Sequence, residues 1–336
     1  MTFQFRRNSK FALLAISGIG STLPDEEYQL DDGTWVMPRL PAVADLAKWK
    51  EWIGSIRSDE LKGANLVLLL EEESSDPMVL DAVHYRLRDA VVLLYNCLQL
   101  RPGIEALAAN LLLGSSIDGS VLIRQISKLM PFFQCKGYSV ASLSVAWLSE
   151  ALLLRSGIEA MQSVAGHYVR FRRGLDVLFK ALREEAAERH HDIVRAIEAL
   201  ILPKTGTTQR QFIHRCQTFA LANPRTETVL REIFDMRSDT EHLQDWNRAV
   251  AAYPVNQRDD ICWQRLRQVQ HLACYSYSRL LLNPTLLSNF RADDDISRFW
   301  RMRDDQRRTL WGPGVNIAAE PLVTKYDQWG RAILQI

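Results

Sequence analysis

The stretch Val229–His242, with the sequence VLREIFDMRSDTEH, is the part of the chain from which the fold is best inferred. Its apolar residues recur at the spacing of one buried helical face: Val229, Leu230, Ile233 and Phe234. Arg237 continues that face at a position where an apolar residue is expected. Because an unpaired guanidinium is costly to bury, Arg237 must meet a fixed anion or lie on a cleft. Arg237 is therefore the first candidate functional residue.

The chain around this stretch has a strongly helical pattern from about residue 139 to Trp311. Apolar spacing, with glycine and proline as stops, predicts helices near residues 139–155, 158–184, 189–202, 207–222, 225–251 and 258–282. No internal repeat is visible, so a solenoid is not expected.

The first part of the chain has a mixed pattern. Short apolar runs at residues 11–16 and 65–70 predict strands, and a helix is expected at 42–56. Asp32-Gly33 lies between two strand-like segments and predicts a hairpin, because this dipeptide supplies the positive φ of a tight turn. Residues 76–99 predict another helix, and residues 110–126 a second hairpin.

Together these patterns predict an α+β protein that is predominantly α. A shift of composition near residues 136–138 separates a mixed α/β region, 1–138, from a helical domain, 139–311. A sensing or regulatory role is expected for the first region. Residues 312–336 are expected to form an extended tail, which must dock because it carries Leu322, Tyr326, Trp329, Ile333 and Leu334.

The overall composition is that of a soluble globular protein, with 336 residues, 47% apolar residues and a net charge of +1. This charge gives no global field that would steer nucleic acid. The five cysteines are scattered without a C-x-x-C pair, which disfavours a disulfide framework and a zinc site. The apolar runs are too short for a signal peptide or a membrane span. We therefore expect a cytoplasmic protein with no membrane contact, metal or cofactor.

An arginine followed after four to six residues by a histidine occurs three times: Arg183–His190, Arg237–His242 and Arg265–His271. Chance alone would give about two such pairs, so the spacing decides nothing. The context favours the second pair, because Ser238-x-x-Glu241 is a capping-box pattern that predicts a new helix and a bend at Arg237. On a straight helix, residues five apart point about 140° away from each other. A bend or a dimer is needed for Arg237 and His242 to share a ligand.

Three segments together resemble a known family. Residues 171–179 (FRRGLDVLF), 191–201 (HDIVRAIEALI) and 233–242 (IFDMRSDTEH) resemble, in order and spacing, the HEPN domain (higher eukaryotes and prokaryotes nucleotide-binding) of the Apea-like branch. The resemblance covers about a third of the chain. The sequence departs from the family pattern with Ile197 in place of leucine, Phe234 in place of tyrosine, and Leu243 where glycine often follows.

The resemblance implies a metal-independent endoribonuclease of a defence or toxin–antitoxin system that acts as a homodimer, with an antitoxin or another defence protein as a further partner. Arg237 would hold the scissile phosphate of the RNA, and His242 would take the proton of the ribose 2′-hydroxyl. The products would be a 2′,3′-cyclic phosphate and a 5′-hydroxyl. Ser238, Asp239 and Glu198 would be supporting residues. The alternative is a non-catalytic HEPN-like scaffold for interaction or ligand binding.

Several candidates have a second interpretation. Ser238 could orient the phosphate or cap a helix, and capping is favoured. Glu198 lies at the edge of an apolar stripe, where it either pairs with Arg237 or is solvated. His190-His191 is typical of an exposed helix start. Residues 168–173 mix aromatics with arginines, which suits RNA contact, but buried aromatics with arginines that reach the solvent are the commoner case.

Overall fold

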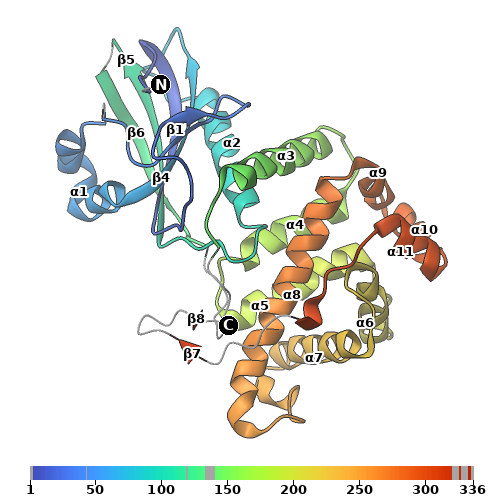
Figure 1. Ribbon diagram of the computed structural model, residues 1–336. Helices are drawn as coiled ribbons and strands as arrows, with labels where there is room; N and C mark the ends of the chain where they lie inside the picture. The colour runs from blue at the N-terminus through green and yellow to red at the C-terminus, as the bar shows by residue number, and fades with distance from the viewer. Residues whose placement is uncertain are drawn as a thin grey trace. The chain divides into compact units, whose positions relative to one another are not determined.

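The computed structural model describes residues 3–42, 44–118, 120–132, 141–319, 325–326 and 332–333. The chain is a mixed α+β protein in which helices predominate, as the sequence predicts (Figure 1). It divides into two compact units, each described here by itself. The first comprises the described residues up to Arg155 except Leu100–Gly103, and the second comprises Leu100–Gly103 and the described residues from Ser156 onward. This division lies inside a helix, later than the shift of composition near residues 136–138.

The first unit is built on a six-stranded antiparallel sheet with the order β2-β3-β4-β1-β5-β6. The strands are β1 (Asn8–Ser17), β2 (Tyr28–Gln29), β3 (Trp35–Met37), β4 (Ala64–Glu73), β5 (Ala108–Ile117) and β6 (Ser120–Leu129). Central β1 is buried along most of its length, which explains why it has an unbroken apolar run. Both predicted hairpins are confirmed, and Gly33 has the positive φ of 86° that the first turn requires.

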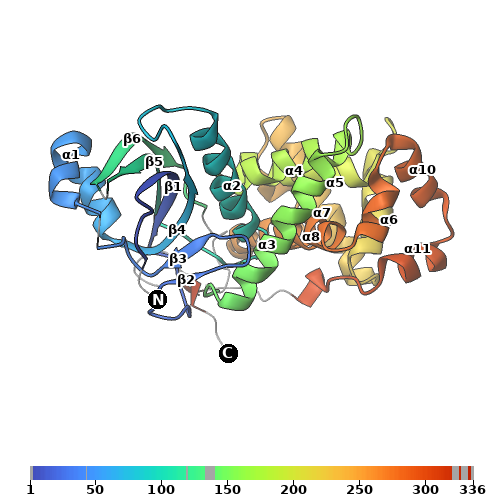
Figure 2. The same cartoon turned by 90° about the horizontal axis from the view of Figure 1, so that it is seen from above.

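Helices α1 (Leu46–Lys62) and α2 (Ala82–Leu98) lie on opposite faces of this sheet (Figure 2). Trp49 and Leu61 of α1 pack with Phe11 and Leu13 of β1 in one apolar core. The helix predicted at residues 42–56 is therefore present, although it begins and ends later and is kinked at Gly54, where φ is 81°.

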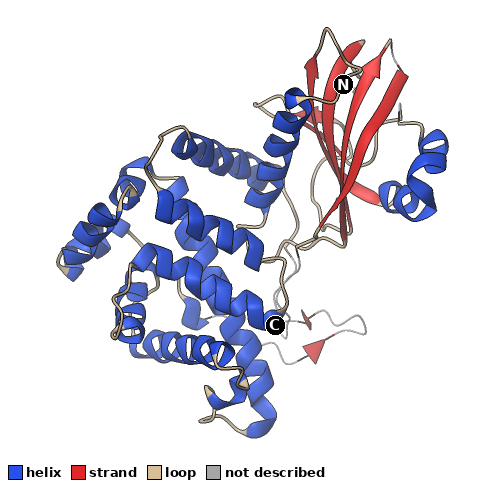
Figure 3. Cartoon of the chain, turned by 180° about the vertical axis from the view of Figure 1, so that it is seen from behind, coloured by secondary structure: helices blue, strands red, loops and turns tan. Residues whose placement is uncertain are grey.

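Nine helices of the described chain follow the sheet (Figure 3). They are α3 (Val145–Gln162), α4 (Val169–Ala181), α5 (Ala186–Ile201), α6 (Thr208–Phe219), α7 (Pro224–Glu241), α8 (Arg258–Leu281), α9 (Pro284–Leu287), α10 (Asp293–Arg301) and α11 (Asp304–Trp311). Within the second unit, α5 packs against α4, α7 and α8, and α6 packs against α7. Helix α5 is thus the central element of this unit, and it brings α4 and α7 to its two sides.

Helix α7 differs from the expectation in one respect that matters for the site. It is continuous from Pro224 to Glu241, so the predicted bend at Arg237 and the extension to residue 251 are wrong. The helix is capped by Asn223, whose side chain accepts a hydrogen bond of 2.8 Å from the third residue of the helix. Ser238 is an interior residue rather than an N-cap. The helix ends because Leu243 adopts a left-handed φ of 55°.

The C-terminal segment is only partly described. Ile317–Ala319 forms a 3-10 turn with Ile317 buried, and the short strands β7 (Lys325–Tyr326) and β8 (Ala332–Ile333) pair with each other. Of the apolar residues that were expected to dock the tail, Leu322, Trp329 and Leu334 lie outside the described residues. None of the helices in the described part of the chain has the length and apolar composition that crossing a bilayer requires.

Candidate functional site

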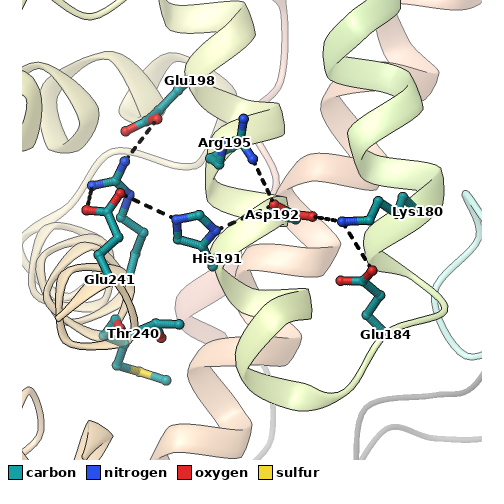
Figure 4. A network of polar contacts seen from close by, with 10 residues as sticks. Lys180, Glu184, His191, Asp192, Arg195, Glu198, Thr240 and Glu241 are labelled. Carbon is teal, nitrogen blue, oxygen red and sulfur yellow. Dashed lines mark hydrogen bonds and ion pairs between the residues drawn. The ribbon is translucent and has the colours of Figure 1, made fainter. Parts of the chain in front are cut away.

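Arg237 extends from α7 toward α5 and meets two carboxylates. Its Nη2 lies 3.6 Å from Oε2 of Glu198 on α5, and its Nη1 donates to Glu241, one turn later on α7 (Figure 4). The Arg237 side chain is 18% exposed and that of Glu198 is 16% exposed. The sequence predicted either a fixed anion or a cleft for Arg237, and the structure provides two anions. The sequence left open whether Glu198 pairs with Arg237 or is solvated, and the structure favours the pair.

The Glu198–Arg237 pair has hydrogen-bonding atoms that no other residue uses in the described part of the chain. Burial raises the pKa of Glu198 above its ordinary value, and the Arg237 guanidinium opposes this change. Oε1 of Glu198 and Nε of Arg237 are both buried and have no hydrogen-bond partner in the described part of the chain. Each member of the pair therefore retains one polar atom that could accept or donate a further hydrogen bond.

His191 of α5 belongs to the same cluster, although it was not among the expected site residues. Its Nε2 lies 3.4 Å from Oε1 of Glu241, and its Nδ1 lies 3.5 Å from Oδ1 of Asp192. His191 and Glu198 are seven residues apart, which places them on one face of the helix. That spacing is the signal in the sequence that could have drawn attention to His191.

Asp192 connects this cluster to α4. It accepts hydrogen bonds from Lys180 of α4 at 3.0 Å and from Arg195 at 3.2 Å. Burial acts to raise the pKa of Asp192, but the two cations outweigh burial and the pKa is below its ordinary value. The resulting network runs from Glu198 through Arg237, Glu241, His191 and Asp192 to Lys180. Figure 4 labels these residues except Arg237.

A cavity of about 420 Å³ lies beside His191 and Glu241. Besides these two residues, its lining includes Lys180, Glu184 and Glu188. Carboxylates outnumber cations here, so the cavity is not a favourable place for a phosphate group. An anion that reaches Arg237 would have to displace Glu241 from it.

His242 lies at the C-terminal end of α7 and is exposed. Its backbone N–H caps the helix by donating to the carbonyl of Ser238 at 3.1 Å. In the part of the chain that the structure describes, its imidazole has no hydrogen bond or ion pair. Because α7 is straight, Arg237 and His242 point in different directions, and one chain does not bring them together.

The other supporting residues lie beside the cluster without joining it. Ser238 is half-buried in the interior of α7, so the capping role that the sequence favoured is wrong. Asp239 is buried, and its Oδ2 has no hydrogen-bond partner in the described chain. Its carbonyl accepts from the N–H of Gln244 at 2.8 Å, which holds the turn that follows α7.

The other two arginine–histidine pairs have structural roles. His190 is fully buried beside Trp246, with ring centroids 5.2 Å apart, so the expectation of an exposed His190 is wrong. Arg265 is buried in α8, and its Nε lies 2.5 Å from Oε2 of Glu232. Its Nη2 donates to the hydroxyl of Tyr253 at 2.9 Å. Arg265 is therefore part of the core of the helical unit.

Comparison of the chain with models of protein families, with curated proteins and with solved structures gave no match. Among the described residues, no three histidine, cysteine, aspartate or glutamate side chains are grouped so that they could hold a metal ion. The assignment of a function therefore depends on the chemistry of the α5–α7 cluster and on the end of α7.

Proposed function

We propose that the helical unit is a metal-independent endoribonuclease that acts as a homodimer, with Arg237 and His242 as its catalytic pair. One observation carries the proposal. Helix α7 presents an exposed imidazole at its end, five residues after a guanidinium that two carboxylates hold in a fixed orientation. A proton acceptor and a pre-positioned cation are the two groups that cleavage of RNA without a metal requires.

The chemistry is a transesterification within the RNA. The imidazole of His242 takes the proton of a ribose 2′-hydroxyl, and the 2′-oxygen attacks the adjacent phosphorus. The bond from phosphorus to the 5′-oxygen breaks, and that oxygen takes up a proton as it leaves. The Arg237 guanidinium binds the phosphate oxygens and stabilises the charge that builds on them. The products are a 2′,3′-cyclic phosphate and a 5′-hydroxyl.

A second copy of the chain is needed because Arg237 and His242 diverge on a straight helix. In a dimer, Arg237 of one copy would act with His242 of the other. Leu243, which follows the end of α7, and Val255 are exposed apolar side chains that such an interface would cover. Leu243 is 96% exposed, and Val255, just before α8, is 78% exposed.

A non-catalytic scaffold is the second candidate, and the ion pairs of Arg237 favour it. An arginine whose role is only to join α7 to α5 would have these two carboxylate partners and no other requirement. The excess of carboxylates around His191 also fits this function better than RNA binding. The two candidates differ in whether Arg237 contributes to a reaction or only to stability.

Labelled RNA incubated with the purified protein and EDTA tests the nuclease. We expect cleavage that EDTA does not prevent and that 2′-O-methyl groups abolish. His242→Ala and Arg237→Ala should each lower the cleavage rate by about 10² to 10⁴. His214→Ala is the matched control, because His214 is also exposed on a helix and pairs with a carboxylate away from the cluster. A rate unchanged by His242→Ala would contradict the proposal.

Light scattering tests the dimer. The native chain should be a dimer at tens of micromolar, and Leu243→Asp should be a monomer that cleaves RNA more slowly. If the chain folds but cleaves no RNA, and Arg237→Ala lowers only its unfolding free energy, the scaffold is the correct function. This outcome separates the two candidates without knowledge of the natural target.

A further inference from the structure

A second cavity, of about 410 Å³, lies between α4 and α5. Cations outnumber carboxylates in its lining, whereas the reverse holds for the cavity beside His191 and Glu241. Three arginines line it: Arg170 and Arg173 from α4, and Arg195 from α5. Asp293 of α10 is its acidic residue, and Val177 and Ala199 are among its apolar ones. Because the whole chain has a net charge of only +1, this concentration of arginines is a local feature.

The three guanidinium groups are not equally neutralised. Arg170 binds both carboxylate oxygens of Asp293, at 2.8 and 2.7 Å. Arg195 shares Asp192 with Lys180 and His191. Arg173 is exposed and has no hydrogen bond or ion pair in the described part of the chain. The cavity therefore contains one uncompensated cation, Arg173, beside two arginines that aspartates neutralise.

The sequence segment 168–173 supplies two of these arginines. Its aromatic Phe171 is buried against Tyr277 of α8, with ring centroids 5.0 Å apart. Arg170 and Arg173 point instead to the cavity. The packing of the aromatic residue thus fixes the rotation of α4 and directs both arginines to one side. Asp293 further fixes the Arg170 guanidinium, so the cavity is partly organised before any ligand binds.

We propose that this cavity binds the phosphate group of a phosphate-bearing ligand, with Arg173 and Arg195 as its main contacts. A guanidinium donates two parallel hydrogen bonds to a phosphate, and several guanidinium groups suit a group with two negative charges. The volume lies within the range of small-molecule sites. The apolar part of the lining suits the uncharged part of such a ligand. This proposal does not depend on the nuclease function.

The ligand could be a free small molecule or the phosphorylated end of a strand, and both sources supply the same phosphate chemistry. Binding is measured by calorimetry at about 50 mM salt, where charge contacts are strong. The probes are inorganic pyrophosphate and two five-nucleotide 2′-O-methyl RNAs, one with a 5′-phosphate and one with a 5′-hydroxyl. These RNAs cannot be cleaved by attack of a 2′-hydroxyl. Repeating the measurement with the His242→Ala protein also excludes cleavage by the proposed catalytic pair. A failure of the nuclease proposal therefore leaves this test intact.

We expect pyrophosphate, the 5′-phosphorylated RNA, or both to bind, and the 5′-hydroxyl RNA to bind at least tenfold more weakly than its phosphorylated counterpart. Binding of pyrophosphate without the phosphorylated RNA indicates a free ligand, and binding of the phosphorylated RNA, with or without pyrophosphate, shows that the cavity accepts a strand end. Arg173→Ala should weaken binding by about tenfold or more, because it removes hydrogen bonds between charged groups. Arg210→Ala is the control, since Arg210 is an exposed arginine on α6. No binding at millimolar concentration, or binding that Arg173→Ala leaves unchanged, would overturn the proposal.

Discussion

His190 gives the sharpest test of the energetics of the helical unit. Its ring is fully buried, and in the described part of the chain neither ring nitrogen has a hydrogen-bond partner. Burial, with a smaller contribution from the neighbouring His191, lowers the pKa of His190 to about 3. The unfolded chain binds a proton at this residue near pH 6.5, whereas the folded chain does not. Stability should therefore be lost as the pH falls from about 6.5 toward 3.

The size of the effect follows from the two pKa values. Crossing the whole window corresponds to about 5 kcal/mol of unfolding free energy. Between pH 7.5 and pH 5.5 only the upper part of the window is crossed, and the loss is about 1 kcal/mol. This smaller range is preferable for an experiment, because most carboxylates of the chain stay ionised throughout it.

The perturbation is His190→Phe, which keeps a ring beside Trp246 and removes the titration. Urea unfolding at pH 7.5 and 5.5 should show that the native protein loses about 1 kcal/mol more than the variant. At pH 7.5 the variant should be as stable as the native protein or about 1–3 kcal/mol more stable, because no unpaired ring nitrogens remain buried.

His214→Phe is the control for this experiment. His214 is exposed, so its replacement by phenylalanine introduces the same ring without removing a buried imidazole. The pKa of His84 in the sheet unit is also lowered, chiefly by burial, but His84 is present in both proteins and cancels in the comparison. An equal loss of stability in the native protein and in His190→Phe would refute the reasoning, since a protonated imidazole would then be accommodated without cost.

Three further substitutions test the packing of the helical unit by urea unfolding. Arg265→Met should cost about 3–5 kcal/mol because it leaves Glu232 buried and unpaired, and adding Glu232→Leu should restore most of the loss. Gly174→Ala should cost about 1–3 kcal/mol, since its Cβ would lie 2.1 Å from Oη of the buried Tyr277. Asn223→Ala should cost about 1 kcal/mol because it removes the N-cap of α7. Stability unchanged by a substitution would mean that the corresponding contact is unimportant.

The elements of the fold could be predicted from the sequence where the signal is local. The apolar run of β1 and the Asp32-Gly33 turn each specify a structure without reference to distant residues. The ends of helices could not be predicted where one sequence pattern is compatible with two structures. Ser238-x-x-Glu241 is a capping box at a helix start, but in a helix interior Glu241 pairs with Arg237 four residues before it. Only the tertiary structure decides between the two.

The candidate site could be predicted only in part, because some of its features are local in the sequence and others depend on the packing of two helices. The position of Arg237 on an apolar stripe required an anion or a cleft, and this requirement depends only on local spacing. The identity of the anions did not follow, because Glu198 meets Arg237 only when α5 packs against α7. His191 was missed since its partner Glu241 comes from another helix. Adjacent histidines at a helix start gave no indication that one is buried and the other partly exposed.

Helix α5 shows why residues so close in sequence have such different environments. His190 and His191 are adjacent and therefore about 100° apart around the axis, which places the first in the core and the second toward α7. Glu198 returns to the side of His191 after two turns, where it meets Arg237. Arg195 lies between His191 and Glu198 in the sequence and lines the cavity between α4 and α5. One helix thus contributes to the stability of the unit, to the Arg237 cluster and to the proposed phosphate site, so substitutions in α5 need stability and binding to be measured separately.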